Sequence, residues 1–155
     1  MCLPLWANTP VRPYKSETKP TMQFKHDNLR QQFYDLNATD PRLRAVALEL
    51  DFFFRQKFGR ELTITSVCRT EEEQRQLYPE FFARVGRARP SAHLDRPCRA
   101  VDLRSRDLSP EEIDALRNYF NTWWDELPGW AFLVNDRAEA FPHIHIQVGK
   151  KIGTP

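Results

Sequence analysis

Hydrophobic residues recur at helical spacing over residues 41–58, and this is the clearest pattern in the chain. The apolar positions fall three or four apart, as on one face of a helix: Leu43, Val46, Ala47, Leu50, Phe53, Phe54 and Phe58. Asp40 can cap the first turn, Pro41 fits the first helical position, and Gly59 is a natural stop. We expect a core-facing helix here, and a weaker pattern predicts another over 25–36.

Capping signals predict two further helices. Thr70 followed by Glu73 forms a capping box, which predicts a helix over 71–79. Ser109 with Pro110 at the next position and a glutamate three residues after the cap predicts another helix start. The apolar face of that helix consists of Ile113, Leu116, Phe120 and Trp123 or Trp124.

Short β-branched or alternating segments predict strands. They lie at 61–67, 99–103, 130–134 and 143–148. The Arg, Pro and Gly residues of 80–98 indicate a long loop. Helices mixed with short strands predict an α+β fold with a small, mostly antiparallel sheet and flanking helices. Residues 1–24, rich in Pro and without periodicity, predict an extended N-terminal arm, and residues 25–155 a single domain.

Composition narrows the classes of protein. The chain has 155 residues, with 23 Lys plus Arg against 21 Asp plus Glu, a net charge of +2. This balance gives no reason to expect nucleic acid or a membrane as partner. No run approaches the roughly 18 apolar residues of a membrane helix, and the N-terminus does not look like a signal peptide. Three cysteines do not suggest a disulfide framework: Cys2, Cys68 and Cys98.

Two histidines share one face of the last predicted strand. His143 and His145 are two residues apart, so their side chains and that of Gln147 point to the same side, with neighbours roughly 7 Å apart. The residues between and after them point into the core: Ile144, Ile146 and Val148. Two imidazoles on one face, backed by apolar residues, indicate a candidate site.

Asp102 is a second candidate. It lies between Val101 and Leu103 in a short strand, so its carboxylate faces away from its apolar neighbours. Such a carboxylate is costly to bury unless it is paired or binds a metal. A salt bridge to Arg99 or Arg104 is the alternative interpretation.

A metal site follows from combining these candidates. His93, nine residues before Asp102, forms with Asp102 and either His143 or His145 a set of two imidazoles and one carboxylate. This set is common for a catalytic zinc with an open water position. Cys98 lies close by and is an alternative ligand.

Arg69 ends a predicted strand and precedes a capped helix, a position where functional residues collect. A guanidinium there suits a substrate carboxylate or a developing oxyanion. The alternative is pairing with one of the glutamates at 71–73, and the spacing alone favours it.

Three motifs follow one another over residues 61–148. They consist of Arg69, Thr70 and Gln74, then Ser91, His93, Ala100 and Asp102, and finally His143 and His145. In this order the chain resembles the family of zinc D-Ala-D-Ala carboxypeptidases and L-alanyl-D-glutamate endopeptidases of the cell wall, whose fold is shared by the Hedgehog signalling domain. His93 and Asp102 are nine apart where the family has seven, so the loop between them must bulge, and Cys98 stands where Gly is common.

The resemblance assigns roles residue by residue. The implied zinc ligands are His93, Asp102 and His145. His143 is implied as the histidine that supports the transition state without binding the metal. Glu139 is implied as the general base, with Asp136 as the alternative. The residues implied for substrate binding are Arg69, Gln74 and Ser91, and Arg69 also for catalysis.

The function implied is zinc-dependent hydrolysis of peptide bonds in peptidoglycan stem peptides, of the D,D-carboxypeptidase or L-Ala-D-Glu endopeptidase type. The short chain suggests a monomeric phage or prophage lysin, made in the cytoplasm without a signal peptide and acting in the periplasm or cell wall after release. One alternative is a non-catalytic, zinc-stabilised binding or structural module on the same fold. A non-haem iron oxygenase is another, but its usual His-x-Asp motif and many-stranded barrel are not found in this sequence.

Overall fold

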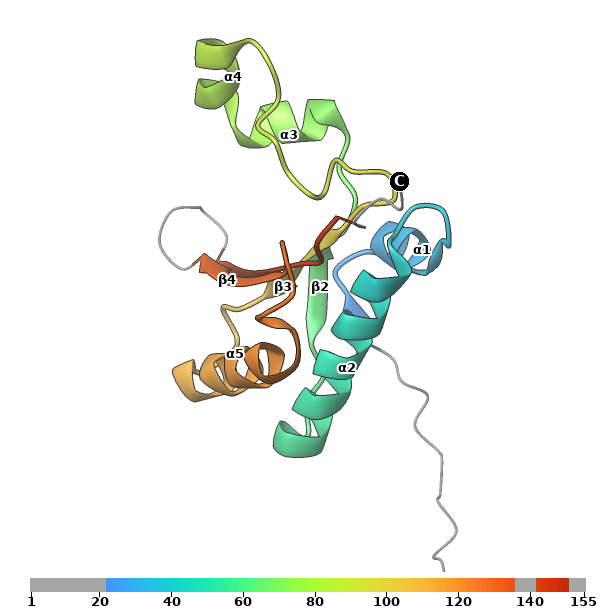
Figure 1. Ribbon diagram of the computed structural model, residues 1–155, viewed down its shortest axis with the longest axis vertical. Coiled ribbons are helices and arrows are strands. Elements are labelled where there is room, and N and C mark those ends of the chain that lie inside the picture. Colours follow the sequence, from blue (N-terminus) through green and yellow to red (C-terminus); the bar gives the residue numbers. More distant parts are fainter. Residues whose placement is uncertain (1–21, 136–141, 151–155) are drawn as a thin grey trace, which may run out of the picture.

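The computed structural model describes residues 22–135 and 142–150, which form five helices and one five-stranded sheet. The predicted α+β class is therefore confirmed. In chain order the elements are β1 (Gln23–Phe24), α1 (Asp27–Tyr34), α2 (Pro41–Phe58), β2 (Thr63–Ser66), α3 (Glu71–Leu77), α4 (Pro79–Val85), β3 (Ala100–Arg104), α5 (Pro110–Trp124), β4 (Ala131–Asn135) and β5 (His143–Gln147) (Figure 1).

The sheet has the strand order β1-β2-β3-β5-β4. The pairings β2–β3, β3–β5 and β4–β5 are antiparallel, and only β1–β2 is parallel, so the sheet is mostly antiparallel as predicted. The edge strand β1 was not predicted, because it is two residues long and falls at the end of the predicted arm 1–24. Residues 1–21 of that arm lie outside the described residues.

Helices α2 and α5 pack against one face of the sheet (Figure 1). The local signals for α2 act as expected: the Asp40 side chain accepts a hydrogen bond from the backbone N of Arg42 at 2.9 Å, and Gly59 takes the left-handed φ of 68°. The capping boxes that begin α3 and α5 are both present. The core between helices and sheet includes Leu43, Leu50, Phe54, Val101, Leu103, Leu116, Phe120, Ile144 and Ile146.

Helices α3 and α4 differ from the prediction. The helix expected over 71–79 ends at Leu77, and α4 occupies the start of the segment 80–98 that was predicted to be a loop. Helix α4 buries none of its residues, so no apolar stripe marks it in the sequence. In Figure 1 the two helices stand away from α2 and α5, beyond the opposite side of the sheet.

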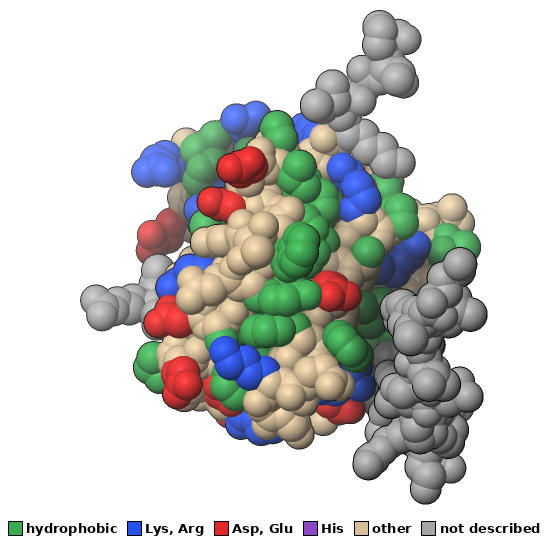
Figure 2. All heavy atoms as spheres, turned by 60° about the horizontal axis from the view of Figure 1, so that its bottom comes forward, with side chains coloured by type: hydrophobic (Ala, Val, Ile, Leu, Met, Phe, Trp, Pro, Cys, Tyr) green, Lys and Arg blue, Asp and Glu red, His purple; other side chains and the backbone are tan. Residues whose placement is uncertain are grey.

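A groove of about 580 Å³ opens between α2 and α5. Hydrophobic side chains gather on this side of the molecule (Figure 2), and the groove is lined by Arg42, Ala45, Val46, Glu49, Tyr119, Trp123, Trp124 and Trp130. The tryptophans therefore lie on the helical side of the sheet, whereas the histidines of β5 lie on its other face. Within the described residues, every helix is too short or too polar to cross a membrane.

Candidate metal centre

The strand register brings Asp102 and His145 together. In the pairing of β3 with β5, these two residues are direct partners, so their side chains lie on the same face of the sheet. Their neighbours along the strands point to the other face and are fully buried: Val101, Leu103, Ile144 and Ile146. The alternation seen in the sequence therefore positions two of the three predicted ligands.

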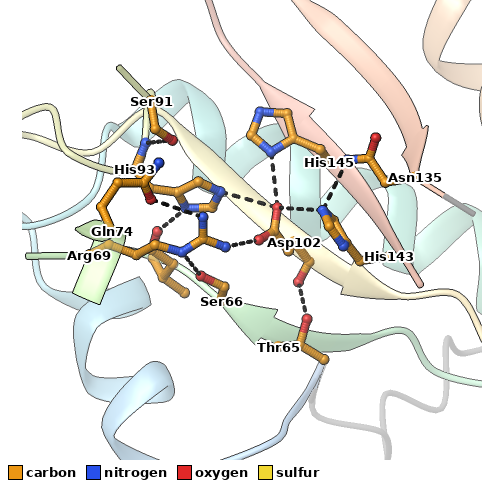
Figure 3. Close-up of polar contacts among 11 residues, drawn as sticks. Thr65, Ser66, Arg69, Gln74, Ser91, His93, Asp102, Asn135, His143 and His145 are labelled. Atoms are coloured by element: carbon orange, nitrogen blue, oxygen red, sulfur yellow. Dashed lines mark hydrogen bonds and ion pairs between the residues drawn. The ribbon is translucent and has the colours of Figure 1, made fainter. Parts of the chain in front are cut away.

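The third predicted ligand, His93, comes from the loop that precedes β3. Backbone hydrogen bonds hold this loop in place: Arg69 N donates to His93 O at 3.0 Å, and Arg99 N donates to Ala92 O at 2.9 Å. The imidazole is 1% exposed and points at Asp102 (Figure 3). The loop thus delivers its histidine to the cluster despite the nine-residue spacing.

His93, Asp102 and His145 converge on a single point. Asp102 Oδ1 lies 3.1 Å from His93 Nε2 and 2.9 Å from His145 Nδ1, as Figure 3 shows. One ligand atom from each residue lies within 4.8 Å of the others, so the group could hold a metal ion. The prediction that these three residues come together is confirmed.

The hydrogen bonding of His93 favours a cation in this cluster. Its Nδ1 contacts the backbone carbonyl of Val67, which only accepts, so Nδ1 must carry the proton. Its Nε2 faces the Asp102 carboxylate, which requires either a second proton or a positive ion between the two atoms. Burial lowers the pKa of His93 despite the nearby Asp102 carboxylate, so the second proton is disfavoured. A metal ion between the two atoms would resolve this conflict.

Asp102 is held in its charged form. Burial would raise the pKa of its carboxyl, but His93, His145 and Arg69 together lower that pKa well below the usual value. Arg69, through Nη2, forms an ion pair with Oδ2, the oxygen that does not face the imidazoles. The carboxylate is therefore available to bind a cation through Oδ1 at any ordinary pH.

The sequence did not identify the salt-bridge partner of Asp102. Arg99 was one alternative, but it pairs with Asp95, its Nε lying 2.8 Å from Oδ2. Arg104 was the other, and it lies 3.5 Å from Asp107. The alternative of a local partner was wrong because β2 ends beside β3, which brings an arginine 33 positions away in sequence to the carboxylate.

Arg69 is engaged on several sides. Besides Asp102, its Nε donates to Ser66 Oγ at 3.0 Å and its Nη1 to Gln74 Oε1 at 3.4 Å, and its side chain is 15% exposed. It does not pair with the nearby glutamates. Glu73 closes the capping box with Thr70 instead. Arg69 thus belongs to the hydrogen-bonded network around Asp102.

Gln74 and Ser91, predicted to bind substrate, make contacts within the chain. Gln74 is 1% exposed and donates to the backbone carbonyl of Arg89 at 3.1 Å. Ser91 Oγ accepts from the backbone N of His93 at 3.3 Å. In this arrangement Gln74 supports Arg69, and Ser91 supports the turn that carries His93.

His143 stands beside the cluster. Its Nε2 lies 3.9 Å from Asp102 Oδ1, farther than the nitrogen of His145, which agrees with a histidine next to the metal position. Asn135 Nδ2 lies 3.0 Å from the same nitrogen. The sequence did not suggest Asn135, because only the pairing of β4 with β5 places it opposite His143. Glu139 and Asp136, the two candidate bases, lie outside the described residues.

Cys98 is not a metal ligand. It forms a disulfide with Cys68, a pairing that the sequence analysis did not predict, and this corrects the alternative in which Cys98 binds zinc. The bond joins the residue before Arg69 to the loop that carries His93, so it ties together two segments that contribute to the cluster.

Comparisons with protein-family models, with curated proteins and with solved structures give no match to this chain.

Proposed function

We propose that this protein is a zinc peptidase of the Hedgehog-like fold that hydrolyses peptide bonds in peptidoglycan stem peptides. The observation that supports the proposal most directly is the convergence of His93 Nε2, His145 Nδ1 and Asp102 Oδ1 within 4.8 Å. Two imidazoles and one carboxylate leave a coordination position open, as a catalytic zinc requires. The motif order in the sequence supplies the substrate class.

The chain's own residues would prepare this site for hydrolysis. Val67 O fixes the His93 ring through Nδ1, and Arg69 orients the Asp102 carboxylate through Oδ2. A zinc ion held by His93, Asp102 and His145 would provide Lewis-acid chemistry, namely a water nucleophile active near neutral pH and polarisation of the scissile carbonyl.

His143 is positioned to assist the reaction without binding the ion. It shares the strand face of His145 and is mostly buried, with 13% of its side chain exposed. From there it would donate a hydrogen bond to the oxyanion that develops on the substrate carbonyl. Glu139 is proposed to take the proton of the nucleophile and deliver it to the leaving amine.

Metal analysis tests the ligand set first. Purified protein should retain about one zinc per chain after dialysis, and His93→Ala, Asp102→Ala and His145→Ala should each lose it. His26→Ala is the matched control, because His26 is exposed and lies at the start of α1, outside the cluster. Unchanged zinc content in all three ligand variants would rule out the site.

Digestion of purified peptidoglycan tests the activity. Mass spectrometry of the released fragments should show new peptide termini with the zinc-loaded protein and none with the three ligand variants, and the termini identify the bond. A protein that binds zinc and is stabilised by it but releases no new termini would instead be the non-catalytic module.

A further inference from the structure

Residues 70–92 project from the rest of the protein. From this point on, "the arm" means this segment and not the N-terminal residues 1–24. It contains α3 and α4, which contact each other, and α4 buries none of its residues (Figure 1). A seven-residue helix without tertiary burial gains little stability of its own. Core packing therefore does not explain why α4 forms. Binding of a partner to its exposed surface would explain it.

The tip of the arm carries exposed positive charge. Arg84, Arg87 and Arg89 are all exposed, and Glu80 is the only acidic residue among positions 78–90. Among the described residues, no acidic side chain forms an ion pair with any of these three arginines. An anionic partner would therefore meet three guanidinium groups whose charge no carboxylate in the described part of the chain neutralises.

Arginines also cover the aromatic rings of the arm. Guanidinium carbons lie 5.0 Å from the Phe82 ring centroid, 5.9 Å from that of Phe81 and 4.7 Å from that of Tyr78. These contacts hold cations over the ring faces that would otherwise be free to enter a lipid layer. The surface therefore suits a hydrated, anionic polymer better than a bilayer.

The arm connects directly to the metal cluster at both ends. At its start, the buried Gln74 joins Arg69 to the backbone of Arg89. At its end, Ser91 accepts a hydrogen bond from the backbone of His93. A polymer held by the arm would be kept close to the cluster.

We propose that the arm is a docking surface for peptidoglycan, and that Arg84, Arg87 and Arg89 bind the free carboxylates of its stem peptides. This inference rests on the proposed function for the identity of the polymer. Docking does not require cleavage, however, so the two proposals can fail separately. The charge complementarity is between three exposed arginines and a polymer whose peptides carry carboxylates.

Co-sedimentation of the zinc-free protein with insoluble peptidoglycan tests the docking surface. The triple variant R84Q/R87Q/R89Q should bind at least about tenfold more weakly than wild type, and wild-type binding should weaken in high salt. The control R30Q/R106Q/R117Q makes the same charge change outside the arm and should bind like wild type. Peptidoglycan whose carboxylates have been amidated should lose the binding.

Activity separates docking from chemistry. Zinc content should be the same in the arm variant and in wild type, whereas digestion of insoluble peptidoglycan should slow. Equal binding by the two triple variants, no binding by wild type, or binding to anionic lipid vesicles in place of peptidoglycan would each overturn the proposal. Binding through the arm without any new termini would refute the peptidase and leave docking intact.

Discussion

Replacing Arg69 by glutamine tests whether this residue holds Asp102 in place. The Asp102 side chain is 4% exposed, and Arg69 is the ion-pair partner of its Oδ2 atom. A buried carboxylate that loses its cationic partner keeps its desolvation penalty, and measured losses for such pairs are about 3–5 kcal/mol. Because the Arg69 side chain is itself 15% exposed, we expect the lower end, about 3 kcal/mol, in the zinc-free protein.

The same substitution should weaken zinc binding. Removing a group that orients a metal ligand typically costs about 10- to 100-fold in affinity. Urea unfolding of the zinc-free protein gives the stability loss, and competition with a chelating dye gives the zinc affinity. In Arg69→Lys, which keeps the charge but loses the planar fork, both losses should be smaller.

Arg55→Gln is the matched control. Arg55 is 17% exposed and lies 3.0 Å from the fully buried Asp51, so its loss also leaves a buried carboxylate without its cation. Its stability loss should be similar to that of Arg69→Gln, while its zinc affinity should be unchanged. If Arg69→Gln bound zinc as tightly as Arg55→Gln but showed only a higher KM, Arg69 would contact the substrate, as the resemblance implies.

Three further outcomes can be measured. Burial raises the pKa of Asp51 in the folded protein. This group therefore favours folding most below its unfolded pKa of about 3.9, and that contribution is lost as pH rises through the folded pKa. In urea unfolding, the stability of wild type relative to Asp51→Asn should fall from acid to neutral pH. Reducing the Cys68–Cys98 disulfide, whose sequence separation is 30, should lower the free energy of unfolding by about 3.5 kcal/mol, and a double alanine variant should not respond to reductant. Glu139→Gln should keep its zinc but lose about 100-fold or more in turnover, and full activity would assign the base elsewhere.

The elements that the sequence predicted well are those with local signals. Helix α2 begins at Pro41 and ends before Gly59, because the cap, the first-turn proline and the left-handed glycine act within a few residues of themselves. The strand β5 was also predicted well, since alternation is a property of neighbours. These features depend little on the rest of the chain.

Helix α4 escaped prediction for the opposite reason. The helical stripe is a signal of burial, and α4 has no buried residue. Its remaining local signals are Pro79 at the first position and Gly86, which has a φ of 72°. Both residues also fit a loop, which is how the segment 80–98 was interpreted.

The contacts around Asp102 divide in the same way, into those that a local pattern predicts and those that depend on strand pairing. His145 and Asp102 were predicted to share a face from the alternation of each strand. The contact of Arg69 with Asp102 depends on β2 lying next to β3, which no local pattern encodes. Asn135 likewise reaches His143 only through strand pairing.

The nine-residue spacing of His93 and Asp102 and the cysteine at position 98 belong to one loop. The carbonyl of Ala92 accepts a hydrogen bond from Arg99 N at 2.9 Å, so the residues between them form a loop whose two ends are held together. The nine-residue spacing is accommodated in this loop, and His93 still lies next to Asp102. Cys98, in place of a glycine, ties the end of the loop to Cys68. The disulfide therefore restricts the loop that carries His93, which counteracts the freedom that its length would give it.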